Sequence, residues 1–173
     1  MRKITLLIFL LFVGIYAKAQ TLDVVYKPYG EKYSICVIKP TIQNFISLLS
    51  LDENQFELVM KEYKYFEENS SGKYRAFWNG TLDNYVYAEC VNTYNFNVMR
   101  NEIRFFVASD MVYPSDAITS LFRALKPYYK MSKPNEESIP VDYFAFKENG
   151  FMYEFFILST LKLYDITVLK KEL

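Results

Sequence analysis

Two carboxylates, Glu89 and Glu154, lie in aromatic-rich stretches that are predicted to be strands. A pair of carboxyl groups in an apolar setting is what a glycoside hydrolase uses, one as the acid and the other as nucleophile or base. A solvent-facing position on a strand explains each residue without any chemistry. No catalytic residue is therefore assigned, and a carboxylate-dependent hydrolase using Glu89 or Glu154 is retained as an alternative function.

The chain lacks the residues that most other catalytic and metal-binding sites require. There is no His among the 173 residues, which excludes Ser-His-Asp triads, Cys-His pairs and His-based zinc sites. Neither a phosphate-binding Gly-rich loop nor a Gly-x-Ser-x-Gly motif occurs. The acidic pairs lack the alternating spacing of a calcium loop; they are Asp52-Glu53, Glu67-Glu68 and Glu136-Glu137. We therefore expect a protein that is not an enzyme and that holds neither a cofactor nor a metal.

The chain has two cysteines, Cys36 and Cys90, both in predicted strands. An even pair in an oxidising compartment is compatible with a disulfide. Two buried free thiols are the other interpretation, because cysteine packs like a small apolar residue. Spacing in the sequence does not decide between them, since a disulfide requires the two Cα atoms to lie within bonding range.

Aromatic residues make up 18% of the chain and are its most informative set. In the predicted strand 85–91, small apolar residues alternate with larger ones, and we expect the small set to pack under the helices. The opposite face of the sheet would then present four aromatic residues, Tyr74, Trp78, Tyr85 and Tyr87. Such a face suits recognition of a protein or a glycan. Alternatively, the two halves of the chain form one sheet whose back is closed by the amino-terminal arm and the loops.

The first 19 residues have the order of a secretory signal peptide. Arg2 and Lys3 precede an apolar run from 4 to 16, and Ala17-Lys18-Ala19 has the small-x-small form of a cleavage site. The apolar run is too short to span a bilayer, so no membrane span is expected after cleavage. We expect a secreted or periplasmic mature chain that begins at Gln20. The ending Ala-Lys-Ala-Gln before a Tyr- and Asn-rich chain resembles the small, uncharacterised secreted proteins of Bacteroidota.

Charge argues against nucleic acid as a partner. The precursor has 20 basic and 20 acidic residues, and cleavage would remove three basic ones, Arg2, Lys3 and Lys18. A mildly acidic chain without a basic run lacks the electrostatic footprint of a nucleic-acid-binding protein. The remaining residues, 20–173, suit one domain with a full core.

The first half reads as a strand, helices and a hairpin. A polar arm or edge strand, 20–32, precedes a strand at 33–39. Apolar spacing over 41–66 predicts two helices, with Ser50 and Glu53 as a capping box between them, although one bent helix also fits. A hairpin at 74–91 follows, with Asn79-Gly80 as its turn signal.

The second half repeats this order. Residues 96–99 and 102–108 are predicted to form a hairpin, and 116–126 a helix that ends at Pro127. Residues 130–140 are predicted to be a loop. A second hairpin over 143–158 turns at Asn149-Gly150 and is apolar on both faces, which places it at the centre of the core. A last strand spans 161–169.

The motif Tyr-x-Ala-Phe begins the predicted hairpin of each half, at Tyr74 and at Tyr143. We interpret the chain as two β-α-β-β repeats, at about 33–91 and 102–169, in one α+β domain with an antiparallel sheet and helices on one face. This element order is similar to the duplicated folds of the β-lactamase-inhibitor protein and the TATA-binding protein.

The expected function is non-catalytic binding, to a protein or a glycan, through the Tyr- and Trp-rich sheet face. An enzyme-inhibitor or immunity-type protein is the first alternative, and it predicts a rigid protruding loop. Two segments are candidates for that loop, Asn92–Asn101 and Lys130–Pro140.

Overall fold

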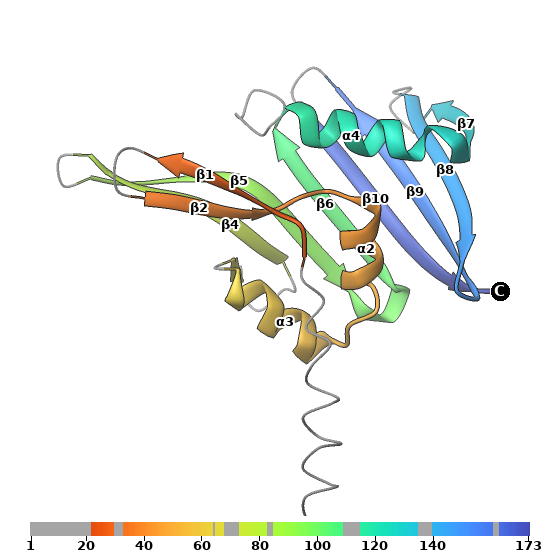
Figure 1. Cartoon of the computed structure of the whole chain (residues 1–173), viewed down its shortest axis with the longest axis horizontal. Coiled ribbons are helices and arrows are strands. Elements are labelled where there is room, and N and C mark those ends of the chain that lie inside the picture. Colours follow the sequence, from red (N-terminus) through yellow and green to blue (C-terminus); the bar gives the residue numbers. More distant parts are fainter. Residues whose placement is uncertain are drawn as a thin grey trace, which may run out of the picture.

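The chain has an α+β architecture in the computed structural model, with an antiparallel sheet and helices on one side of it (Figure 1). In places, 74–82 and 85–93 among them, only the backbone is described. The structure describes residues 22–29, 33–63, 65–67, 73–82, 85–108, 115–134, 140–160 and 163–173.

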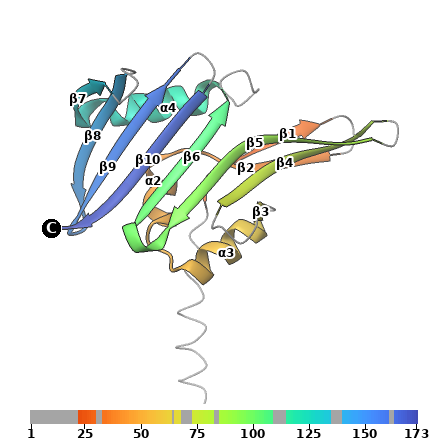
Figure 2. The same cartoon turned by 180° about the vertical axis from the view of Figure 1, so that it is seen from behind.

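Eight of the described strands form one sheet in the order β3-β4-β5-β6-β10-β9-β8-β7, and all of its pairs are antiparallel. The last strand of the chain, β10, thus lies between β6 and β9. Figure 2 shows this sheet from the side without helices. The strands are β3 Phe66–Glu67, β4 Lys73–Leu82, β5 Tyr85–Asn97, β6 Glu102–Ala108, β7 Tyr129–Pro134, β8 Pro140–Glu148, β9 Phe151–Ser159 and β10 Leu163–Glu172.

The first two strands form a sheet of their own. The predicted strand at 33–39 is present as β2, Tyr33–Ile38, and it pairs with β1, Val24–Tyr29, which lies in the segment predicted to be an arm or edge strand. This two-stranded ribbon lies on the helix side of β4 and β5 (Figures 1 and 2). The first strand of the second half, β6, belongs to the main sheet, so the first strands of the two halves have different partners.

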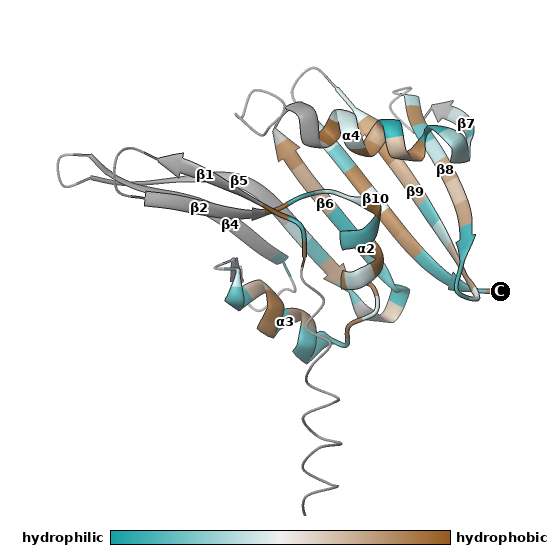
Figure 3. Ribbon diagram, in the orientation of Figure 1, coloured by the Kyte–Doolittle hydropathy of each residue, from teal (hydrophilic) through white to brown (hydrophobic). Residues whose placement is uncertain are grey.

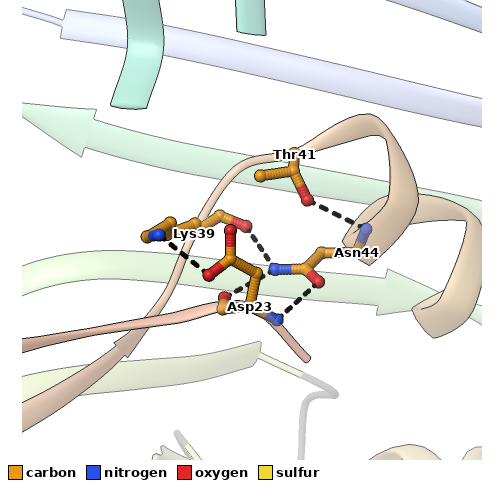
Figure 4. A network of polar contacts seen from close by, with 4 residues as sticks. All are labelled: Asp23, Lys39, Thr41 and Asn44. Atoms are coloured by element: carbon orange, nitrogen blue, oxygen red, sulfur yellow. Dashed lines mark hydrogen bonds and ion pairs between the residues drawn. The ribbon is translucent and has the colours of Figure 1, made fainter. Parts of the chain in front are cut away.

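A buried amide ties this ribbon to the first helix, α2, Ile42–Leu48 (Figure 4). The side chain of Asn44 accepts a hydrogen bond from the Asp23 N–H at 3.0 Å, and it donates to the carbonyl oxygens of Asp23 and Lys39, both at 2.8 Å. Lys39 also forms an ion pair with Asp23 at 2.8 Å, and Thr41 caps the helix by accepting from the Asn44 N–H. The ribbon and α2 are therefore joined at one point.

The segment 41–66 contains two helices, as the sequence favours. The cap of the second helix, however, lies two residues later than predicted. The second helix is α3, Glu53–Glu62, and its capping box joins Asp52 with Gln55. Ser50, predicted as the cap, instead donates from its hydroxyl to the Ser47 carbonyl. The helical range also ends earlier than predicted, because Phe66 belongs to β3.

The third helix is α4, Ser115–Leu125, and a 3-10 turn, η2, Lys126–Tyr128, contains Pro127, so the predicted stop is confirmed. The prediction of a loop over 130–140 was wrong for 130–134 and for Pro140, because 129–134 form β7 and Pro140 begins β8. Residues 135–139 lie outside the described part of the chain. Proline lacks an N–H, but that donor is not needed on an edge strand, such as β7, or at the first residue of a strand, where Pro140 lies. Pro134 and Pro140 lie opposite each other at the end of this edge pair.

The two Asn-Gly pairs have different structures. Asn149 and Gly150 have φ values of 50° and 83° and join β8 to β9 as predicted. Asn79-Gly80 was predicted to mark a turn, but β4 continues through it to Leu82 and pairs Gly80 with Tyr87. The pairing of whole strands thus outweighs a local turn signal, since each added residue pair extends the ladder.

The predicted turn between 96–99 and 102–108 is confirmed. Strand β5 ends at Asn97, a 3-10 turn, η1, spans Val98–Arg100, and Asn101, with φ of 47°, leads into β6. Because β5 occupies 92–97, the segment Asn92–Asn101 is mostly strand. Neither segment named as a protruding inhibitory loop is therefore a loop throughout.

The core lies between the helices and one face of the main sheet. At its centre Phe45 of α2 meets Phe105 of β6 and Phe155 of β9 edge-on, with ring centroids 6.2 and 5.7 Å apart. All three are buried, and each such side chain contributes about 1.5–3 kcal/mol. Figure 3 shows bands of hydrophobic and hydrophilic residues along β6 and β10, as expected for strands with one buried face.

Two tyrosines join the ribbon to the main sheet. The hydroxyl of Tyr65 accepts from the Ile38 N–H at 3.1 Å, and the hydroxyl of Tyr94 donates to the Ile38 carbonyl at 3.3 Å. Both rings are buried and meet edge-on. They provide partners for both backbone groups of the buried residue Ile38, at the end of β2. Tyr94 is thus a structural aromatic residue.

Candidate open-face binding site

Strand β9 shows how the main sheet divides into two faces. Tyr153, Phe155 and Ile157 are buried against the helix side, while the residues between them keep partial exposure. Successive side chains of a strand point to opposite faces, so those alternate residues lie on the side away from the helices. The hairpin was predicted to be the centre of the core; the structure shows that only one of its faces is core.

The strand register shows which residues of β6, β10, β9 and β8 lie on the face away from the helices. Residues directly opposite each other in a ladder share a face. We call this surface the open face, because no described segment of the chain covers it in Figure 2. Its members are Glu102, Arg104 and Phe106 of β6, Asp165, Thr167, Leu169 and Lys171 of β10, Met152, Glu154, Phe156 and Leu158 of β9, and Val141, Tyr143, Ala145 and Lys147 of β8.

The centre of the open face is apolar. Tyr143 and Phe156 are cross-strand partners, and their rings stack with centroids 4.9 Å apart at an interplanar angle of 20°. Leu158 and Leu169 lie on the same face, and all four side chains are partly exposed. A group of half-exposed apolar side chains on neighbouring strands is suited to recognition, because covering it removes apolar area from water.

Ion pairs border this apolar centre. A guanidinium nitrogen of Arg104 lies 2.8 Å from a carboxylate oxygen of Asp165, and the same guanidinium lies over the Phe106 ring at 5.0 Å. Lys171 pairs with Oε2 of Glu154. Each pair joins neighbouring strands, so the charges brace the ladder as well as border the surface.

The hydroxyl of Tyr143 donates to Oε1 of Glu154 at 2.8 Å. Burial raises the pKa of this hydroxyl, and the hydrogen bond to Glu154 and the charge of that carboxylate raise it further. Tyr143 therefore stays protonated, as a donor, at neutral pH. Glu154 has one oxygen bound by Tyr143 and the other by Lys171, which describes a paired structural carboxylate more closely than a group placed to act on a substrate.

The open face was not singled out from the sequence as a candidate surface. The signal was present, because β8 and β9 are apolar on both faces. The predicted hairpin at 74–91 outweighed this signal, because its Tyr-rich pattern around Trp78 is typical of a half-exposed strand.

The predicted binding residues lie on β4 and β5, whose backbones are described. Tyr74 is opposite Tyr94, Trp78 is opposite Glu89, and Gly80 and Leu82 are opposite Tyr87 and Tyr85. The side chains of Tyr74, Trp78, Tyr85, Tyr87 and Glu89 lie outside what the structure describes, so this site stays a prediction. The same holds for the disulfide between Cys36, on β2, and Cys90, on β5.

Among the described residues, no group of three or more Cys, Asp or Glu side chains is arranged to hold a metal ion. In the same part of the chain, no helix has the length and apolar character needed to cross a membrane.

Comparison of the chain with protein-family models, with curated proteins and with solved structures found no match. The likeness in element order to the β-lactamase-inhibitor protein and the TATA-binding protein stays a prediction.

Proposed function

We propose that this chain is an exported, non-catalytic binding protein that recognises a partner protein through the open face of its main sheet. The observation that carries the proposal is the stacked pair Tyr143–Phe156, partly exposed on β8 and β9 of a sheet whose opposite face is covered by helices. Aromatic side chains supply large, rigid contact area, which is why they dominate the energetics of many interfaces.

A protein fits this surface better than a glycan. Tyr143 and Phe156 each use one ring face on the other, and aliphatic neighbours such as Leu158 and Leu169 surround them. Sugar rings stack on free aromatic faces and require many polar partners for their hydroxyls. An apolar centre with charged borders is the anatomy of a protein–protein interface.

The proposal includes export to the periplasm or the exterior. It is supported by residues 1–19, whose charged start, apolar run and Ala17-Lys18-Ala19 ending have the form of a signal peptide. These residues lie outside the described part of the chain.

The proposal also includes an origin by duplication of a β-α-β-β unit. Its support is the Tyr-x-Ala-Phe motif, which lies in β4 of the first half and β8 of the second. In each half a strand that follows the helical residues, β3 or β7, pairs with the motif strand, and the motif strand pairs in turn with the next strand, β5 or β9. The different partners of β2 and β6 would then be a later divergence between the two units.

Site-specific photo-crosslinking in the native host tests the binding proposal. Thr167 lies between Arg104 and Phe156 in register, so a photo-reactive p-benzoylphenylalanine at this position samples the middle of the open face. We expect a discrete cross-linked adduct that contains protein. The matched control carries the same group at Leu58 of α3, which is 68% exposed on the helix side, and should give no such adduct.

Adding Leu158→Asp to the Thr167 derivative should abolish the adduct, because a carboxylate then occupies the apolar centre. Equal adducts at Thr167 and Leu58, or none at Thr167, would contradict the proposal. An adduct that carries carbohydrate alone would replace the partner protein with a glycan.

A further inference from the structure

The cations and carboxylates of the open face differ in how far they reach into solvent. The side chain of Arg104 is 43% exposed, but its partner Asp165 is only 14% exposed. Lys171 is 56% exposed, and its partner Glu154 is again only 14% exposed. In both pairs the positive end therefore projects and the negative end is recessed.

The register places a further cation beside them. Met152 lies between Lys171 and Lys147 across β10, β9 and β8, and Lys147 is exposed. Arg104 lies at the other border, on β6. The apolar centre thus has projecting cations on two sides. Glu102, also on this face, is the one acidic member outside the two ion pairs, and it lies opposite Leu169.

The Arg104 guanidinium retains unused donors. One of its terminal nitrogens bonds Asp165 and its Nε is buried, while the side chain as a whole is 43% exposed. A guanidinium presents five N–H donors, and carboxylates are their best acceptors. An approaching acidic group would therefore meet a cation that is already held in place by Asp165 and by the ring of Phe106.

The geometry points to a partner protein whose contact surface is apolar at its centre and acidic around it, with carboxylates meeting Arg104, Lys171 and Lys147. This inference rests on the proposed function and adds the chemistry of the partner. A second copy of the chain fits less well, because face-to-face docking would bring the projecting cations of both copies into one interface, where like charges repel.

Two short synthetic peptides test the charge requirement. One alternates glutamate with leucine and the other lysine with leucine, both blocked at their ends. Each is titrated into the isotopically labelled protein, and backbone amide shifts are followed by NMR. We expect the acidic peptide to shift residues of β6, β8, β9 and β10, and to bind at least about threefold more tightly than the basic peptide at low salt. Raising the salt to about 0.5 M should remove most of this preference.

A charge-swapped protein makes the test sharper. The double variant Lys171→Glu with Glu154→Lys keeps the ion pair but makes its projecting end negative. The preference for the acidic peptide over the basic peptide should therefore fall or reverse. Lys147→Glu should have the same direction of effect and involves no ion pair of the described structure. The matched control is Lys126→Glu on η2, an exposed residue outside the open face, which should leave the preference unchanged.

Equal affinity for the two peptides, shifts outside the open face, or no binding of either would overturn the inference about charge. None of these results would affect the Thr167 cross-linking result, which tests the proposed function separately. Shifts at the open face that grow with protein concentration alone would identify a second copy as the occupant, and would also overturn it.

Discussion

Asn44 shows how much of this fold depends on a single side chain. It is 2% exposed, and each hydrogen-bonding position that it uses is directed at the backbone on either side of the ribbon. A buried amide whose bonds are all made to one neighbouring segment specifies where that segment docks.

Asn44→Ala should lower the free energy of unfolding by about 2–4 kcal/mol, because it leaves the Asp23 N–H and the Lys39 carbonyl without this partner. Urea denaturation followed by circular dichroism measures the change. Gln43→Ala, one residue earlier on the same helix but exposed, should change stability by less than about 0.5 kcal/mol. Equal effects of the two substitutions would show that the network in Figure 4 contributes little.

At the scale of elements, the two Asn-Gly pairs show that a local turn signal acts only where the ladder permits it. The pair at Asn149-Gly150 lies between strands that pair out to Glu148 and Phe151, so only two residues remain for the turn. At Asn79-Gly80 the partner strand continues, and the pairing reaches Leu82 and Tyr85. The hairpin was predictable in both places, but the end of the one that contains Asn79-Gly80 was not.

Gly150→Ala tests the turn alone. Its φ of 83° is strained for any residue with a side chain, while a Cβ there would meet no atom within 4 Å, so the cost is conformational. We expect a loss of about 1 kcal/mol in the free energy of unfolding. Asn149→Gly is the matched control, since glycine adopts a φ of 50° readily, and should have a smaller effect. An unchanged denaturation midpoint for Gly150→Ala would argue against this turn geometry.

At the scale of the whole molecule, the main sheet is asymmetric: helices and the β1–β2 ribbon lie on one side, and the open face is on the other. A surface of this kind needs a partner or a compartment in which it is tolerated. Export of the chain would determine which partners it meets.

Expression of the full chain with its own leader in a Gram-negative host tests export. We expect the periplasmic protein to begin at Gln20, as measured by intact mass and amino-terminal sequencing. Ala19→Asp should block cleavage, because the position before the cut requires a small side chain. Recovery of the native chain with residues 1–19 still attached would contradict the export proposal.

The sequence by itself determined the helices, most of the strands and several of their ends. Helix periodicity, the stop at Pro127 and the turn at Asn149-Gly150 depend on neighbours along the chain, and all were predictable. The cap at Asp52 was missed by two residues, because two overlapping segments, Ser50 to Glu53 and Asp52 to Gln55, both have the spacing of a capping box.

Only the tertiary structure decided which face of the main sheet is left open. Arg104 and Asp165 are 61 residues apart, and they meet because β10 inserts between β6 and β9. Alternation along β8 and β9 showed two apolar faces, but it could not show which one the helices would cover. That choice depends on long-range strand pairing and helix packing, in which one buried face satisfies the helices and the other is left exposed.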